Sequence, residues 1–78
     1  MVLITPEQCR MARAALQLSA GDLAALAKVG RNTIVRFESG QQIKPASIEK
    51  LHDALTTAGI EFIPENGGGP GARLKRSN

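Results

Sequence analysis

One stretch of the chain constrains its fold more than any other: residues 19–40, with the sequence S-A-G-D-L-A-A-L-A-K-V-G-R-N-T-I-V-R-F-E-S-G. Ser19 is followed three residues later by Asp22, a pattern in which each side chain caps the other's main chain at a helix start. Three apolar residues then recur at helical spacing, namely Leu23, Leu26 and Ala27. This part of the stretch predicts a short helix.

A second short helix is expected to begin near Gly30 or Arg31 and to end at Gly40, because glycine is favoured just past a helix end. Helices this short bury little surface by themselves, so neighbouring elements must hold them. The second helix carries three polar residues for the outside of the pair: Arg31, Asn32 and Arg36. Two short helices with a tight turn and a polar outer face are typical of a helix-turn-helix.

Helices are also expected on both sides of this pair. Thr5 as N-cap, Pro6 at the first helical position and Gln8 completing a capping box predict a helix that runs to about Leu16. Its apolar stripe is Cys9, Ala12, Ala15 and Leu16. Another helix is expected to start at Pro45 and to stop at Gly59. Its apolar positions are Ile48, Leu51, Leu55 and Ala58.

The composition changes after Gly59. The segment I-E-F-I alternates weakly as a strand does, P-E-N-G-G-G-P-G is turn chemistry, and A-R-L-K-R fits a return strand. In such a hairpin Ile60, Phe62 and Leu74 share one face, and Glu61 lies near Arg73 or Lys75 on the other. The alternative is a flexible basic tail. An isolated two-stranded hairpin is barely stable in water, so this one needs the helices or a second subunit beneath it.

These expectations give an all-α fold, a bundle of about four helices with a C-terminal β-hairpin or extended tail. Residues 1–59 form the helical domain and residues 60–78 the tail. A chain of 78 residues allows one small domain, and its two Phe and absent Trp and Tyr leave the core to aliphatic side chains. The net charge of +3 fits a nucleic-acid partner without requiring one.

The sequence lacks the signals that are typical of other classes of function. One Cys and one His allow neither an internal disulfide nor a standard zinc site, so no metal and no cofactor are expected. Cys9 is interpreted as a buried apolar residue and His52 as a partly covered surface residue. The chain shows no nucleophile–base pair and no phosphate-binding loop, which indicates that it is not an enzyme. No signal peptide or membrane-length apolar run is visible, so a cytoplasmic protein is expected.

The stretch at residues 19–40 also resembles a known family. The Cro/C1-type helix-turn-helix of phage repressors and of the wider xenobiotic-response-element regulators follows S-Q-E-x-L-A-x-x-x-G-V-S-x-x-T-I-x-R-[WF]-E-x-G. The positions that match it are Ser19, Leu23, Ala24, Val29, Thr33, Ile34, Arg36, Phe37, Glu38 and Gly40. The chain departs from the pattern at Ala20 in place of Gln, Lys28 in place of Gly, and Gly30 in place of Ser or Thr. The resemblance implies a lambda-repressor-like bundle.

The resemblance also implies the roles of individual residues. Arg31, Asn32 and Arg36 occupy the positions that read bases, since Arg pairs with guanine and Asn with adenine. Thr33 supports the helix or touches a phosphate. The residues expected near the DNA backbone are Gln41, Gln42 and Lys44, with Ala20 at a helix N-terminus whose main-chain N–H groups hold a phosphate. Arg13 and Glu38 match a structural ion pair.

The expected function is that of a sequence-specific transcriptional regulator of the repressor type. It would bind an inverted-repeat operator in double-stranded DNA as a homodimer. The dimer contact is expected in the tail, at Ile60, Phe62, Ile63 and Leu74, with a contribution from residues 2–4. The alternative is an antitoxin-like or adaptor module, in which the tail binds a partner protein instead.

Overall fold

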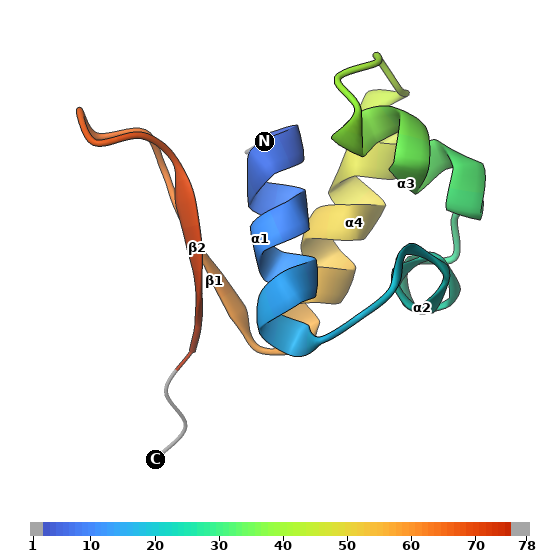
Figure 1. The fold of residues 1–78 in the computed structure, drawn as a ribbon, viewed down its shortest axis with the longest axis horizontal. Helices are drawn as coiled ribbons and strands as arrows, with labels where there is room; N and C mark the ends of the chain where they lie inside the picture. Colours follow the sequence, from blue (N-terminus) through green and yellow to red (C-terminus); the bar gives the residue numbers. More distant parts are fainter. Residues whose placement is uncertain (1–2, 76–78) are drawn as a thin grey trace.

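A computed structural model describes residues 3–75 of the chain (Figure 1). Its elements, in chain order, are α1 (Pro6–Leu16), α2 (Ala20–Ala27), α3 (Arg31–Glu38), α4 (Pro45–Thr57), β1 (Ile60–Ile63) and β2 (Gly71–Leu74). The two strands form an antiparallel hairpin. Helix α1 stands between the hairpin on one side and helices α2 and α3 on the other (Figure 1). The predicted four-helix fold with a C-terminal hairpin is therefore confirmed.

Both predicted capping boxes are present. Thr5 Oγ1 accepts from the main-chain N–H of Gln8 at 3.1 Å, and Gln8 Oε1 accepts from the N–H of Thr5 at 2.9 Å. Ser19 and Asp22 exchange the same two bonds, each at 3.0 Å, at the start of α2. Short local hydrogen bonds thus fix where α1 and α2 begin, which is why sequence spacing locates both starts correctly.

Helix ends require less common backbone conformations. Lys28, which replaces the glycine of the family pattern, ends α2 in the left-handed region with a φ of 58°. Gln17 ends α1 with the same φ, and nothing in the sequence marked it for that conformation. Gly40 after α3 and Gly59 after α4 take φ values of 95° and 111°, as expected of glycines past helix ends.

The core lies where the four helices and β1 meet. Its buried apolar residues are Ile4, Cys9, Ala12, Leu23, Ala24, Ala27, Ile34, Phe37, Leu51, Leu55 and Ile60. Three of the apolar residues that predicted the helices are exposed rather than buried: Ala15, Leu26 and Ala58. Leu26 is 55% exposed because, at about 100° per residue, it lies roughly 105° from the centre of the buried arc set by Leu23, Ala24 and Ala27.

The hairpin has the predicted facing of side chains. Ile60 pairs with Leu74, and Phe62 pairs with Ala72, so these four side chains share one face. On the other face Arg73 Nε donates to Glu61 Oε1 at 3.0 Å. Ile60 is 2% exposed and belongs to the helical core, which shows that the helices support the hairpin as its marginal stability requires.

One buried polar side chain attaches the hairpin to α1. The Gln8 amide nitrogen donates to the carbonyl oxygen of Ile63 at 3.1 Å and to that of Gly71 at 3.0 Å. Gln8 is only 4% exposed, so both bonds are shielded from water. The sequence predicted the capping role of Gln8 but not this contact with residues more than fifty positions away.

Two smaller expectations concern His52 and the N-terminus. His52 is partly covered, as predicted, and its ring stacks on Phe62 with centroids 5.5 Å apart. Ile4 is buried against the core, whereas Val2, also expected to take part in packing, lies outside the described residues. Within residues 3–75, no helix is long and apolar enough to cross a membrane.

Candidate nucleic-acid interface

Helix α3 separates a buried face from a polar outer face. Ile34 and Phe37 point into the core, with exposed fractions of 0% and 5%. Arg31, Asn32 and Arg36 are exposed on the opposite side, and Thr33 lies half-buried between the two faces. The outer face therefore offers two guanidinium groups and one amide on a helix whose position is set by two apolar anchors.

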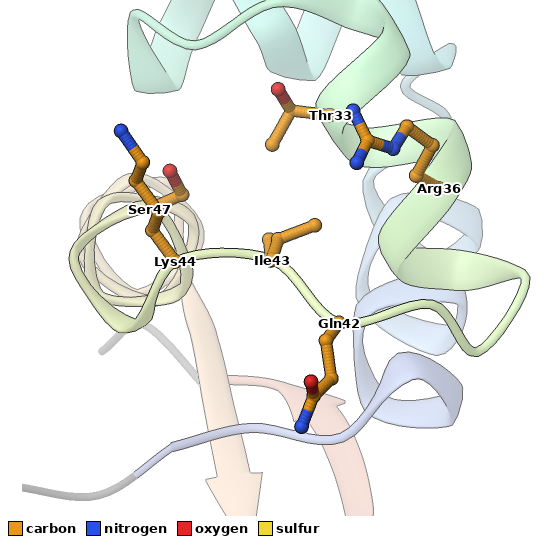
Figure 2. Close-up of a pocket in the computed structure, with 6 residues that line it drawn as sticks. All are labelled: Thr33, Arg36, Gln42, Ile43, Lys44 and Ser47. Carbon is orange, nitrogen blue, oxygen red and sulfur yellow. The ribbon is translucent and has the colours of Figure 1, made fainter.

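A shallow hollow continues this surface between α3 and the start of α4 (Figure 2). It has a volume of about 510 Å³. The residues that line it are Thr33, Arg36, Gln42, Ile43, Lys44 and Ser47. Four of these were predicted to contact DNA. Ile43 and Ser47 were not predicted to contact DNA. The position of Ser47, in the first turn of the helix after α3, is the sequence signal that could have identified it.

The hollow has a positive electrostatic character from two sources. Arg36 and Lys44 each carry a full positive charge beside it. The N-terminus of α4 adds the partial positive charge of a helix dipole, and no side chain caps it. An anionic group that enters the hollow would thus meet cations and hydroxyl or amide donors together, which is the environment that a DNA phosphate requires.

The other end of α3 lies against the first turn of α2. A methyl group added at Gly21 would lie 3.9 Å from Cδ of Arg31, so the stem of Arg31 passes over this turn. Ala20 is half-buried at the same turn. The main-chain and side-chain hydrogen bonds with Ser19 hold the pKa of Asp22 below its ordinary value, so its carboxylate stays ionised in the cap.

An ion pair from α1 fixes the C-terminal end of α3. Arg13 Nε donates to Glu38 Oε2 at 2.8 Å, and Arg13 Nη2 donates to Glu38 Oε1 at 2.6 Å. Arg13 Nη1 also donates to the carbonyl oxygen of Leu18 at 3.1 Å. The side chains of Glu38 and Arg13 are 9% and 24% exposed. This two-point contact fixes the direction of α3 relative to α1.

Two further residues of α1 contact the same glutamate. Arg10 Nη1 donates to the main-chain carbonyl oxygen of Glu38, which the sequence did not predict. Cys9 is fully buried, as predicted, and burial followed by its contact with the Glu38 carboxylate raises the pKa of its thiol. Cys9 therefore stays a neutral thiol rather than a reactive thiolate.

The protonation of the pair follows from these contacts. Burial by itself would raise the pKa of Glu38, but the hydrogen bonds and charges that face it, chiefly from Arg13, outweigh burial and hold that pKa below its ordinary value. The hydrogen bond to Glu38 raises the pKa of Arg13. Both side chains are therefore charged at neutral pH, and Arg13 compensates the negative charge of Glu38 at the end of α3.

The four residues expected at a dimer contact do not form one exposed patch in the chain. Ile60 is enclosed by the helices, Phe62 and Ile63 are half-buried, and Leu74 is 56% exposed. The hairpin that carries them lies on the side of α1 away from α2 and α3 (Figure 1). Any surface that these residues offer is therefore separate from the outer face of α3.

Comparison with known proteins agrees with this geometry. The model of the HTH_3 helix-turn-helix family matches residues 10–61, which span α2, α3 and α4 and most of α1. No curated protein matches the chain significantly. Because the family model covers more than half of the chain, the protein belongs to the HTH_3 family of Cro/C1-type helix-turn-helix proteins, whose members bind DNA as transcriptional regulators.

Proposed function

We propose that this protein is a sequence-specific transcriptional regulator that inserts α3 into the major groove of DNA. The observation that carries the proposal is the outer face of α3, where Arg31, Asn32 and Arg36 are exposed beside a cationic hollow. Arg forms paired hydrogen bonds with guanine and Asn with adenine. These three side chains are the proposed base-reading residues.

The surrounding groups would hold the DNA backbone. Gln41 and Gln42 are exposed in the loop after α3, and Lys44 lies at the hollow with Ser47 and Thr33. At the other end of α3, the main-chain N–H groups near Ala20 are suited to a second phosphate. Contacts at both ends of α3 would fix its depth and angle in the groove, which base recognition requires.

The regulator is proposed to act in the cytoplasm as a homodimer on an inverted repeat. One domain of this size reads few base pairs, and a two-fold dimer doubles the length of DNA that is read. The hairpin at residues 60–74 is the proposed contact, because its position opposite α2 and α3 leaves the reading surface free (Figure 1). A protein partner at the hairpin is the competing assignment.

Site selection from random DNA by the full chain, followed by fluorescence anisotropy with the selected duplex, tests the proposal. Arg31→Ala and Arg36→Ala should each weaken binding by about 1–3 kcal/mol and relax selectivity at one base position. Lys50→Ala on the outer side of α4 removes the same charge away from α3 and is the matched control. Equal losses for all three variants, or no sequence preference in the wild type, would refute the reading surface.

Phosphate contacts predict a different signature for Lys44. Lys44→Ala should weaken binding to all sequences alike and reduce the slope of log affinity against log salt concentration by about 1. The selected sequence should not change. A change of base preference without a change of salt slope would place Lys44 among the base-reading residues instead.

A further inference from the structure

We propose that two copies of this protein join through the outer edge of β2, which forms a four-stranded sheet in the order β1, β2, β2 of the partner subunit, β1 of the partner subunit. This inference rests on the homodimer of the proposed function and specifies its residues and register. It is carried by the main-chain geometry of the hairpin rather than by its apolar character.

The direction of the β2 main-chain groups follows from the ladder. The N–H of Lys75 donates to the carbonyl oxygen of Gly59 at 2.7 Å, so these two residues form a hydrogen-bonded pair. Because hydrogen-bonded and non-hydrogen-bonded pairs alternate in an antiparallel ladder, Arg73 bonds inward to β1 while Ala72 and Leu74 direct their N–H and C=O groups outward. Within the described residues, no turn or loop main-chain group bonds to this outward edge.

The edge of β2 is more accessible than that of β1. Ile60, in β1, is buried, and Phe62 lines a hollow of about 570 Å³ together with Leu3 of the N-terminal segment and His52 of α4. Arg73 and Leu74, in β2, are exposed. Helix α1 packs against β2, but Arg73 and Leu74 remain exposed, so β2 is the more open of the two strands to a second copy.

Two-fold symmetry leaves few registers for a pair of β2 strands. Centring the axis on Arg73 places Ala72 opposite Leu74 of the partner subunit and gives four main-chain hydrogen bonds. Centring it on Ala72 places Leu74 opposite Pro70 of the partner subunit, which has no N–H to donate. Centring it on Leu74 places Ala72 opposite residue 76 of the partner subunit, which lies outside the described residues. Within the described residues, the Arg73-centred register is the one that pairs both outward-facing residues, Ala72 and Leu74.

This register also accounts for an exposed apolar side chain. Leu74 lies on the same face as the buried Ile60, yet its side chain is 56% exposed. In the proposed sheet it packs beside Ala72 of the partner subunit, whose small side chain leaves room. The pairing therefore covers an apolar surface that the single chain leaves open.

Charge is balanced at the centre of the proposed sheet. The register places Arg73 opposite Arg73 of the partner subunit, a pair that would repel by itself. Each Arg73 is already hydrogen-bonded to Glu61 of its own chain at 3.0 Å, so two guanidinium groups and two carboxylates give a neutral row across the four strands. Glu61 is thus the residue that makes the symmetric contact electrostatically acceptable.

Cysteine crosslinking of the full chain tests the register. The native Cys9 is fully buried, so an introduced cysteine is the accessible thiol. Under mild oxidation Arg73→Cys should give a covalent dimer, because residues opposite each other in a non-hydrogen-bonded pair have Cβ atoms about 4.5–5.5 Å apart. Lys75→Cys, which faces Gly71 of the partner subunit, is the control. Equal or faster crosslinking of Lys75→Cys would refute the register.

Sedimentation equilibrium tests the same contact without a covalent crosslink. Leu74→Glu should convert the wild-type dimer to a monomer, whereas Leu26→Glu, at an equally exposed leucine on α2, should leave it dimeric. A dimer that survives Leu74→Glu, or a monomeric wild type, would overturn the inference. A monomeric wild type that selects a specific half-site would overturn the dimer but leave the proposed DNA-reading role of α3 standing. A Leu74-dependent dimer without DNA preference would leave only the inference standing.

Discussion

Helix α1 holds α3 and the hairpin by different chemistry, and the difference explains what each attachment can do. On the α3 side a charged pair, Arg13 with Glu38, joins two side chains through two hydrogen bonds of 2.8 and 2.6 Å. On the hairpin side a neutral amide, Gln8, bonds to two main-chain carbonyl oxygens. The first attachment requires a particular side chain on both helices and changes with pH, whereas the second requires a particular side chain only on α1, because its acceptors are main-chain carbonyl oxygens.

The two attachments also differ in the surface that they serve. The ion pair fixes the end of the helix proposed to read DNA, where a small rotation would misplace every base contact. The amide fixes a hairpin whose outward edge is proposed to join two copies. A single helix thus determines the position of both surfaces, and changes at its two sides should affect different measurements.

The largest effect is expected from breaking the ion pair. Glu38→Ala leaves the partly buried Arg13 without its carboxylate and should lower the free energy of unfolding by about 3–5 kcal/mol. Urea denaturation followed by circular dichroism measures the loss. Glu61→Ala removes a carboxylate from an exposed pair and serves as the control. A small loss for Glu38→Ala would mean that the pair does not fix α3.

A smaller effect is expected from the amide. Gln8→Glu keeps an acceptor for the N–H of Thr5 but replaces the donor that faces Ile63 and Gly71, so the hairpin should loosen while the cap survives. The expected loss is about 1–3 kcal/mol at neutral pH. Relative to the wild type, Gln8→Glu should accelerate hydrogen exchange more in residues 60–74 than in α1. An equal acceleration in the two regions would contradict the prediction.

Acid should weaken the attachment of α3 to α1, because that attachment contains the carboxylate of Glu38. Because folding holds the pKa of Glu38 below its ordinary value of 4.5, its contribution to stability is present above that value and is lost as the pH falls through the lowered pKa. Unfolding of the wild type and of Glu38→Gln, compared from neutral pH to pH about 3, measures this loss. The variant should show the shallower decline; parallel profiles would assign the acid sensitivity to other carboxylates.

The smallest effect is expected at the exposed hairpin pair. Glu61→Gln removes the partner of Arg73, whose pKa is raised by its hydrogen bond to Glu61, but both groups are in water. Thermal unfolding of dilute protein should not change measurably, since exposed pairs contribute little. Association of two copies should weaken, because the two Arg73 side chains would face each other uncompensated. If the two copies associate as strongly as before, Glu61 does not compensate the charge of Arg73 in the dimer.

Much of the α3 side was predictable from local sequence. The capping residues Thr5 and Ser19 locate two helix starts, and Gly40 and Gly59 mark two helix ends, because these signals act within a few residues. The family pattern identifies the outer face of α3. The helical spacing of Leu23, Leu26 and Ala27 predicted α2 correctly but not which of the three is buried, since a spacing rule applied to an eight-residue helix does not define the buried arc sharply.

The hairpin side was predictable in outline only. The alternation of apolar and polar residues predicted its two strands and placed Glu61 and Arg73 on the same face. The bonds of Gln8, the burial of Ile60 and the exposure of Leu74 could not be predicted from the sequence, because each depends on which helix packs against the hairpin. Gln8 bonds to residues more than fifty positions away, whereas Ile60 lies in a strand that packs against α4. The contribution of Ser47 to the hollow similarly depends on the approach of α4 to α3.

The sequence by itself therefore determined the elements of this protein and which helix is proposed to read DNA, because capping, helical periodicity and the family motif are local in the chain. Only the tertiary structure decided how those elements are held and which surfaces remain free. Gln8 shows the difference. Its capping of α1 can be read from the local sequence, whereas its hydrogen bonds to two distant carbonyl groups exist only once the strands are in place.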